Sequence, residues 1–166
     1  MEEMGYRNFD AVRRLGQKGK YAKLRADGTL STSNAALLLL TYMASTTYDW
    51  DTEHNTPTAD AKAKGYPCRY YERGAESFAY DYGKLGITPE QAMSEDPQGY
   101  MDKRRGAANQ EFKRAIKTLT DWGVIKQLER AKNGLPAGYL LLLGDDAENK
   151  AVEQWARRCL NLPMIW

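Results

Sequence analysis

The stretch from residue 103 to residue 143 constrains the fold more than any other part of this 166-residue chain. In its first part, apolar side chains recur at the spacing of a helix that turns by about 100° per residue, so they fall on one face. These side chains are Ala108, Phe112, Ala115, Ile116 and Leu119. The opposite face is polar and basic. The pattern therefore predicts a helix over about residues 107–122 whose apolar face is fixed to a core and whose other face stays open.

A β-hairpin is predicted directly after this helix. Gly123 is placed to end the helix, because glycine adopts the left-handed backbone conformation that a helix end favours. Two apolar runs follow, residues 124–130 and 137–143, and the short loop between them contains the turn-forming pair Asn133 and Gly134. A basic helix that leads into a hairpin with basic residues near its tip is the arrangement of a winged helix.

The chain has the size of one compact domain with extensions. Its 166 residues, of which 42% are apolar, can bury one sizeable core. We expect an α+β, mostly helical fold. An N-terminal arm, helical or docked, is expected over residues 1–19, and a winged-helix domain over 20–144 with an insertion between the two helices of its helix-turn-helix. A helix with a tail is expected over 145–166, packed on the domain or in a dimer.

Composition argues against a membrane protein and against a metal or cofactor site. No run of about 18 apolar residues is present, and the first ten residues carry three acidic side chains and one basic one where a secretory signal is basic. We therefore expect a cytoplasmic protein. Cys68 and Cys159 stand far apart without a second cysteine nearby, which predicts reduced thiols and neither a disulfide framework nor a zinc site. No metal and no cofactor is expected.

The net charge of +2 hides a strong segregation of charge along the chain. The net charge is +4 over residues 1–25, −6 over 26–99, +5 over 100–132 and −1 over the remainder. Positive charge thus gathers in the N-terminal segment and in the predicted helix and hairpin. Such a distribution indicates a face directed at phosphate, although a charged face that only meets solvent explains it too.

The first half of the chain is expected to supply the core helix. Residues 21–25 alternate apolar with basic side chains, which favours a strand that joins the hairpin as its third strand. Residues 34–45 are apolar on nearly all sides, so they predict a helix enclosed in the core, with Ser31 or Ser33 as its N-cap. The polar, acidic residues 47–65 that follow are expected to form a long exposed loop.

Further helices are predicted before and inside the insertion at residues 84–106. The first helix of the helix-turn-helix is indicated by Ala75, Phe78, Ala79 and Tyr82 at helical spacing. Inside the insertion, Thr88 begins a capping box that predicts a short helix to about Ser94. The insertion ends on three basic residues, expected either to contact phosphate just before the recognition helix or to lie in a solvated loop: Lys103, Arg104 and Arg105.

The order of these elements resembles that of the winged helix-turn-helix proteins of actinobacteria, their plasmids and their phages. The resemblance covers roughly residues 20–143, and the insertion at residues 84–106 is longer than the pattern of that family. The motifs that carry the resemblance are Tyr70-Tyr71 with Gly74, Arg114-Ala115-Ile116 with Leu119, Gly123-Val124-Ile125, and Tyr139-Leu140-Leu141. The resemblance implies a DNA-binding protein similar to transcription regulators or replication initiators.

We expect the open side of the helix to enter the major groove of double-stranded DNA and to read its sequence. Gln110 is expected to form two hydrogen bonds to adenine, and Arg114 or Lys117 to donate to O6 and N7 of guanine. Lys113 is expected to contact a phosphate. The hairpin tip is expected on the neighbouring backbone or in the minor groove. The full set of expected DNA-binding residues is Lys103, Arg104, Arg105, Asn109, Gln110, Lys113, Arg114, Lys117, Arg130, Lys132 and Asn133.

Two other function classes compete with DNA binding. The main alternative is a winged-helix module for protein interaction, such as a phage protein that binds a host protein, because the acidic middle segment opposes DNA contact. Catalysis is not expected: with a single histidine, His54, there is no His-x-His nuclease motif, and the sequence shows no Ser-His-Asp arrangement, phosphate-binding loop or CxxC pair. His54 is expected to be an exposed loop residue rather than a metal ligand or an acid/base group. A homodimer through the C-terminal helix would suit a symmetric DNA site.

Overall fold

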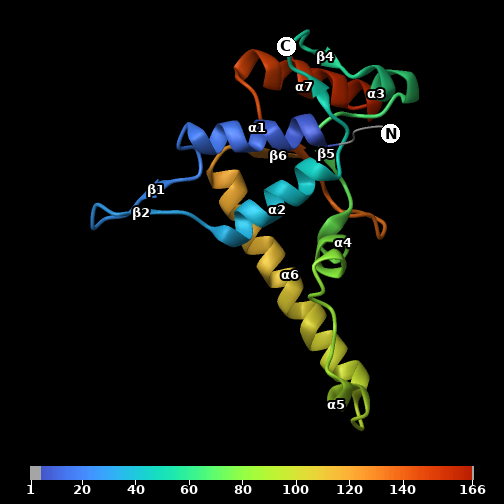
Figure 1. The fold of residues 1–166 in the computed structure, drawn as a ribbon. Coiled ribbons are helices and arrows are strands. Elements are labelled where there is room, and N and C mark those ends of the chain that lie inside the picture. Colours follow the sequence, from blue (N-terminus) through green and yellow to red (C-terminus); the bar gives the residue numbers. More distant parts are fainter. Residues whose placement is uncertain (1–4, 166) are drawn as a thin grey trace.

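The computed structural model describes residues 5–165, and within them the chain forms seven helices and three small antiparallel sheets (Figure 1). Residues 1–4 of the predicted arm and Trp166 of the predicted tail lie outside the described part. The helices are α1 (Tyr6–Gln17), α2 (Asn34–Ser45), α3 (Ala59–Lys64), α4 (Gly74–Asp81), α5 (Pro89–Ala92), α6 (Pro97–Asp121) and α7 (Asp146–Cys159). The strands are β1 (Lys23–Leu24), β2 (Leu30–Ser31), β3 (Trp50–Asp51), β4 (Thr56–Pro57), β5 (Tyr70–Tyr71), β6 (Ile125–Glu129) and β7 (Gly138–Leu141).

The predicted α+β, mostly helical class is confirmed. No helix within residues 5–165 is both long enough and apolar enough to cross a membrane.

The central sheet consists of β5, β7 and β6, in that order. β6 and β7 are antiparallel neighbours, as predicted for the hairpin, with Ile125 opposite Leu141. β5 is the third strand, and its Tyr70 pairs with Leu140 of β7. The prediction that residues 21–25 supply this third strand was wrong, because β1 pairs with β2 in a separate two-stranded ribbon.

Helix α2 lies at the centre of the main core, as its apolar side chains predicted. Ser33 caps it, because the Ser33 hydroxyl accepts a hydrogen bond from the backbone N–H of Ala36 at 3.2 Å. Leu39, Leu40 and Met43 are fully buried. They belong to one apolar cluster with side chains of α1, α4, α6 and the central sheet. The main core therefore joins elements from nearly the whole chain.

A second, smaller core lies between α7 and the segment that precedes β5. Its members are Trp50, Ala61, Cys68, Leu140, Val152 and Ala156, each at most 2% exposed. The prediction of an exposed loop over residues 47–65 was therefore wrong: this segment forms β3, β4 and α3, and it buries Trp50 and Ala61. These two side chains stand too far apart in the sequence to form a periodic apolar pattern.

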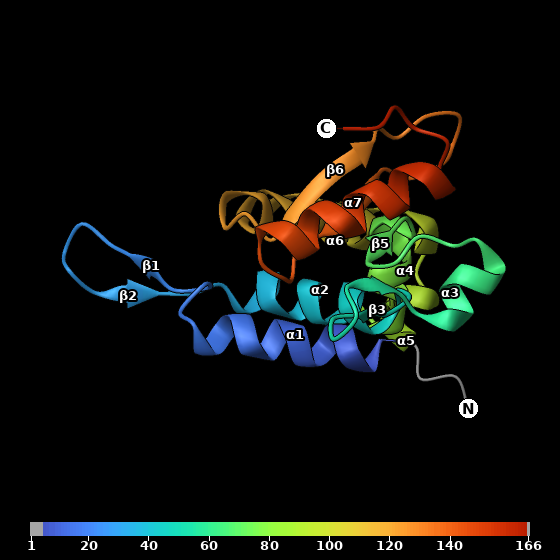
Figure 2. The same ribbon diagram turned by 90° about the horizontal axis from the view of Figure 1, so that it is seen from above.

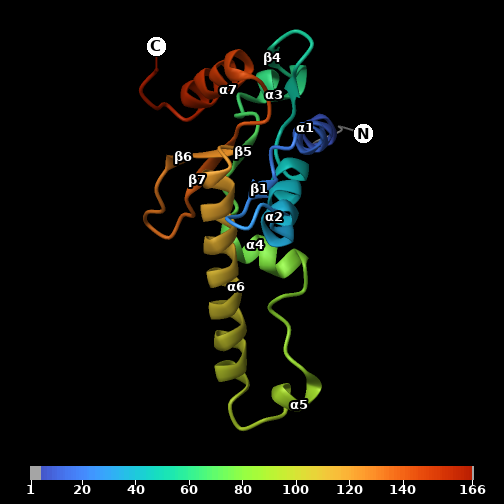
Figure 3. The same cartoon turned by 90° about the vertical axis from the view of Figure 1, so that its left-hand side faces the viewer.

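Helix α6 begins about three turns before the predicted start at residue 107. Asp96 is its N-cap, because the Asp96 carboxylate accepts a hydrogen bond from the backbone N–H of Gly99 at 2.9 Å, and Pro97 fills the first turn without loss of a hydrogen bond. The helix has 25 residues and is about 37 Å long. Its first turns project from the body beside α5, which begins with the predicted capping box at Thr88 (Figures 1 and 3).

The N-terminal segment forms helix α1, and a buried hydrogen-bond network ties this helix to the body. Asn8 is fully buried and donates a hydrogen bond from its amide to the backbone carbonyl of Tyr48 at 2.9 Å. The amide oxygen of Asn8 accepts a hydrogen bond from the Arg69 guanidinium at 2.9 Å. Arg69 also forms a buried ion pair with Glu148 of α7. One guanidinium thus joins α1, the start of β5 and α7.

Removing the Glu148 carboxylate is expected to destabilise the fold strongly. The substitution Glu148→Ala leaves the Arg69 guanidinium buried without its counter-ion, which costs about 3 to 5 kcal/mol of the free energy of unfolding. Lys150→Ala, on the exposed side of the same helix, is the matched control and is expected to cost less than about 0.5 kcal/mol. Urea unfolding measures both values, and two variants of equal stability would contradict the role of this ion pair.

Candidate nucleic-acid interface

The two sides of α6 differ sharply in burial. The side chains of Ala108, Phe112, Ala115 and Leu119 on one side are buried. On the other side, five polar or basic side chains fall within an arc of about 100° around the helix axis, and all are exposed. We call this set the basic arc; it consists of Lys103, Gln110, Lys113, Arg114 and Lys117.

Few groups inside the protein engage the basic arc. Lys117 pairs with Asp121 at 2.9 Å, but these side chains are 78% and 56% exposed, so the pair contributes little to stability. The side chains of Gln110, Lys113 and Arg114 form no hydrogen bond or ion pair with any residue in the described part of the chain. Their polar groups are therefore available to a ligand.

Two of the predicted contact residues turn away from the basic arc. The Arg104 guanidinium donates a hydrogen bond to the backbone carbonyl of Gly86 at 3.0 Å, and Arg105 pairs with Glu76 of α4 at 3.5 Å. Around the helix axis Arg104 and Arg105 lie about 120° and 140° from Gln110, on opposite sides. The prediction that residues 103–105 precede the helix was wrong, because they lie inside α6.

The remaining predicted contact residues lie at the tip of the hairpin β6–β7 and beside it. Arg130, Lys132 and Asn133 are exposed. Asn133 and Gly134 have positive φ angles of 50° and 76° and form the predicted turn, which a β-bridge at Lys132 closes. A hollow of about 580 Å³ lies between this tip, the first turn of α4 and Asn109 of α6. The hairpin tip is therefore next to one flank of the basic arc.

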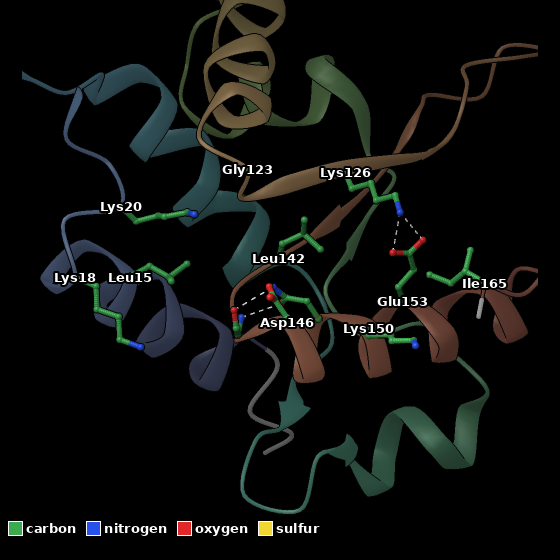
Figure 4. Close-up of a pocket in the computed structure, with 12 residues that line it drawn as sticks. Leu15, Lys18, Lys20, Gly123, Lys126, Leu142, Asp146, Lys150, Glu153 and Ile165 are labelled. Carbon is green, nitrogen blue, oxygen red and sulfur yellow. Dashed lines mark hydrogen bonds and ion pairs between the residues drawn. The ribbon is translucent and has the colours of Figure 1, made fainter. Parts of the chain in front are cut away.

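A second basic region lies near the other end of α6, and the sequence analysis missed it. Four lysines line a hollow of about 540 Å³ between α1, α7 and the start of β6 (Figure 4): Lys18, Lys20, Lys126 and Lys150. Lys126 is paired there with the buried carboxylate of Glu153 at 2.8 Å. The other three lysines form no hydrogen bond or ion pair through their side chains with residues 5–165. Lys18 and Lys20 belong to the basic N-terminal segment, but Lys126 and Lys150 come from distant parts of the chain, so no local pattern in the sequence marks the region as a whole.

The surroundings of His54 and Cys68 show how these two side chains are placed to react. His54 is exposed, as predicted, and its Nδ1 lies 2.9 Å from an Asp51 carboxylate oxygen, a hydrogen bond that raises the pKa of His54. Burial raises the pKa of the Cys68 thiol to about 12, so this thiol is protonated and inert at neutral pH. Among residues 5–165, no group of three or more His, Cys, Asp or Glu side chains is placed to hold a metal ion.

A scan against protein-family models and searches of the curated proteins and of the solved structures found no match for this chain. The geometry and charge of the chain itself therefore carry the functional interpretation.

The stability of the fold is expected to depend on the ionisation of Glu153. Burial raises the pKa of this carboxyl, but hydrogen bonds from Lys126 and Arg157 outweigh burial and hold the pKa below its usual value of 4.5. The ionised form therefore stabilises the folded protein fully above pH 4.5, and this contribution is lost as the pH falls through the lower pKa of the folded state.

The substitution Glu153→Gln tests this pH dependence. It is expected to lower the free energy of unfolding by about 2 kcal/mol at neutral pH, and by progressively less as the pH falls below about 4.5. Glu95→Gln, at an exposed position, is the matched control and leaves the pH profile of the parent protein unchanged. Denaturant unfolding between pH 7 and pH 3 gives the profiles, and a loss that stays constant over this range would contradict the assignment.

Proposed function

We propose that the chain is a sequence-specific double-stranded DNA-binding protein with a winged-helix fold. The basic arc of α6 enters the major groove, and the hairpin β6–β7 contacts the backbone or the minor groove. The observation that carries this proposal is the contrast between the two sides of α6. One side is buried in the core, and the other presents exposed donors, three of which no described residue engages. Such a face is complementary to base edges and phosphates.

The order of the elements supports a winged helix. Apart from the β3–β4 pair and α3, the chain from residue 34 onward runs through α2, β5, α4, α5, α6, β6 and β7. In the sheet, β7 lies between β5 and β6. In this interpretation α4 and α6 are the two helices of the helix-turn-helix. The insertion at residues 84–106 then corresponds to α5 and the first turns of α6.

The dimensions of the basic arc suit a major groove. From Lys103 to Lys117 the arc extends about 21 Å along the helix axis, and a major groove about 12 Å wide admits a helix. Gln110, at the centre of the arc, is able to form two hydrogen bonds to adenine, and Arg114 or Lys117 to reach guanine. Lys113 lies at the edge of the arc, where a phosphate is the nearer partner.

A module for protein interaction is the second candidate function, and the projecting part of the molecule favours it. Tyr80 of α4 and Met101 of α6 line one hollow and are 74% and 39% exposed, and Met93, directly after α5, is 89% exposed. Exposed apolar groups of this size gathered in one region mark a protein contact, here with a host or phage protein. A homodimer through α7 has less apolar surface to use, because Val152 and Ala156 of this helix are fully buried within the chain.

Reversing the charge of the basic arc is expected to abolish DNA binding. The triple variant Lys113→Glu, Arg114→Glu, Lys117→Glu is expected to lower the affinity on the order of 100-fold or more, because each lost base contact costs about 1 to 3 kcal/mol. The affinity is measured by fluorescence anisotropy with a duplex that the parent protein selects from a random-sequence pool. Circular dichroism of the variant confirms that it is folded.

A matched control separates contact from overall charge. The triple variant Lys62→Glu, Lys64→Glu, Arg158→Glu changes the net charge by the same amount, from +2 to −4, but on α3 and α7. Its affinity is expected to stay much closer to that of the parent protein. If the folded arc variant binds the duplex with the affinity of the parent protein, the proposed function is wrong. It is also wrong if both triple variants lose affinity equally.

A further inference from the structure

The two-stranded ribbon β1–β2 projects from the body and is exposed along most of its length. Residues 22–30 are all exposed, although two strands alone are only marginally stable. Its base is held by Tyr21, whose buried hydroxyl donates a hydrogen bond to the backbone carbonyl of Val12 at 2.7 Å. The Tyr21 ring also lies 5.3 Å from the ring of Trp122, at the end of α6. The ribbon is thus fixed to α1 and α6 at its base, while its tip stands free (Figure 2).

The ribbon and its base are strongly basic. Four cationic side chains form no hydrogen bond or ion pair with residues 5–165: Lys18, Lys20, Lys23 and Arg25. The single carboxylate of residues 18–31, that of Asp27, accepts hydrogen bonds from the hydroxyl and the backbone N–H of Thr29 at 2.6 and 2.9 Å. Lys23 lies in β1, and Arg25 follows the strand and continues its ladder, because its backbone N–H donates a hydrogen bond to the carbonyl of Thr29 at 2.7 Å. Two residues apart along such a ladder, the two side chains fall on the same face of the ribbon.

The ribbon and the hairpin β6–β7 flank the basic arc on opposite sides. A hollow of about 660 Å³ lies between the ribbon and the last turns of α6, where Thr118 and Trp122 line it. The hollow beside the hairpin tip borders α6 at a different residue, Asn109. Around the helix axis, Thr118 lies about 80° to one side of Gln110 and Asn109 about 100° to the other. Figures 1 and 2 agree with this placement, because α6 lies between the ribbon and the loop of the hairpin.

We propose that the ribbon β1–β2 is a second contact with the DNA backbone, in which Lys23 and Arg25 bind phosphates on the side of α6 opposite the hairpin. This inference rests on the proposed function and extends it. A helix in a major groove has a phosphate backbone on each side, and the hairpin is placed to reach only one of them. When a cationic side chain without an internal partner neutralises a phosphate, counterions condensed on the DNA are released, so each such contact adds to the salt dependence of binding.

Neutralising the ribbon tests this contact through the salt dependence of binding. The probe is a fluorescein-labelled duplex of roughly 30 base pairs, about three helical turns, and fluorescence anisotropy gives the affinity over a range of salt concentrations. The pair Lys23→Gln, Arg25→Gln is expected to weaken binding at low salt. It is also expected to make the slope of log affinity against log salt shallower by about 1.8, because two phosphate contacts are lost. The control pair Lys62→Gln, Arg158→Gln lowers the net charge equally, from +2 to 0, and keeps the parent slope.

The possible outcomes separate this inference from the proposed function. If the ribbon pair and the control pair have the same slope, while the arc variant loses binding, the ribbon is not a phosphate contact and the role of α6 stands. If the parent protein does not bind the duplex at any salt concentration, the proposed function and this inference both fail. The four substituted side chains are exposed, so each pair is expected to unfold within about 1 kcal/mol of the parent protein.

Discussion

The burial of one side of α6 determines how the other elements and the basic arc are placed. Phe112, Ala115 and Leu119 pack into the same core as α2 and the central sheet. Since a fully buried side chain of the size of Phe or Leu contributes about 1.5 to 3 kcal/mol, the helix is unable to turn its basic arc inward without losing several such contributions. The direction of the arc is therefore set by the core and not by the charges on the arc itself. Ile125 of β6 and Leu141 of β7 belong to the same core, which fixes the hairpin beside the helix.

The distribution of ion pairs explains why the basic arc stays positive in a chain whose net charge is only +2. Glu111, on the edge of α6, is engaged by Lys84 at 2.7 Å, and Glu76 faces Arg105 on the far side of the helix. Deeper in the protein, Arg69 and Glu148 neutralise each other. The two carboxylates beside α6 are thus neutralised by Lys84 and Arg105, and the side chains of Lys113 and Arg114 stay unpaired within the described residues. The net charge of the chain thus understates the potential at the arc.

The sequence predicted those elements whose determining residues lie close together. The apolar stripe of α6, the end of that helix at Gly123 and the turn at Asn133 and Gly134 all depend on local spacing or local backbone conformation. The wrong predictions depended on contacts between distant segments, which local patterns do not contain. Packing selects β5 rather than residues 21–25 as the partner of β7, and the lysines of the hollow in Figure 4 come together only in the fold. The early start of α6 was missed because a proline marks the first turn of a helix as readily as it ends one.

An NMR titration shows whether the exposed side of α6 contacts DNA. Uniformly ¹⁵N-labelled protein is titrated with a selected duplex, and the shifts of its amide signals are followed residue by residue. We expect the largest changes on residues 103–117 of α6, with smaller changes at the hairpin tip and none on α3. Largest changes around α5 and Tyr80, with the basic arc unmoved, would contradict this expectation and would identify the projecting region as the contact surface.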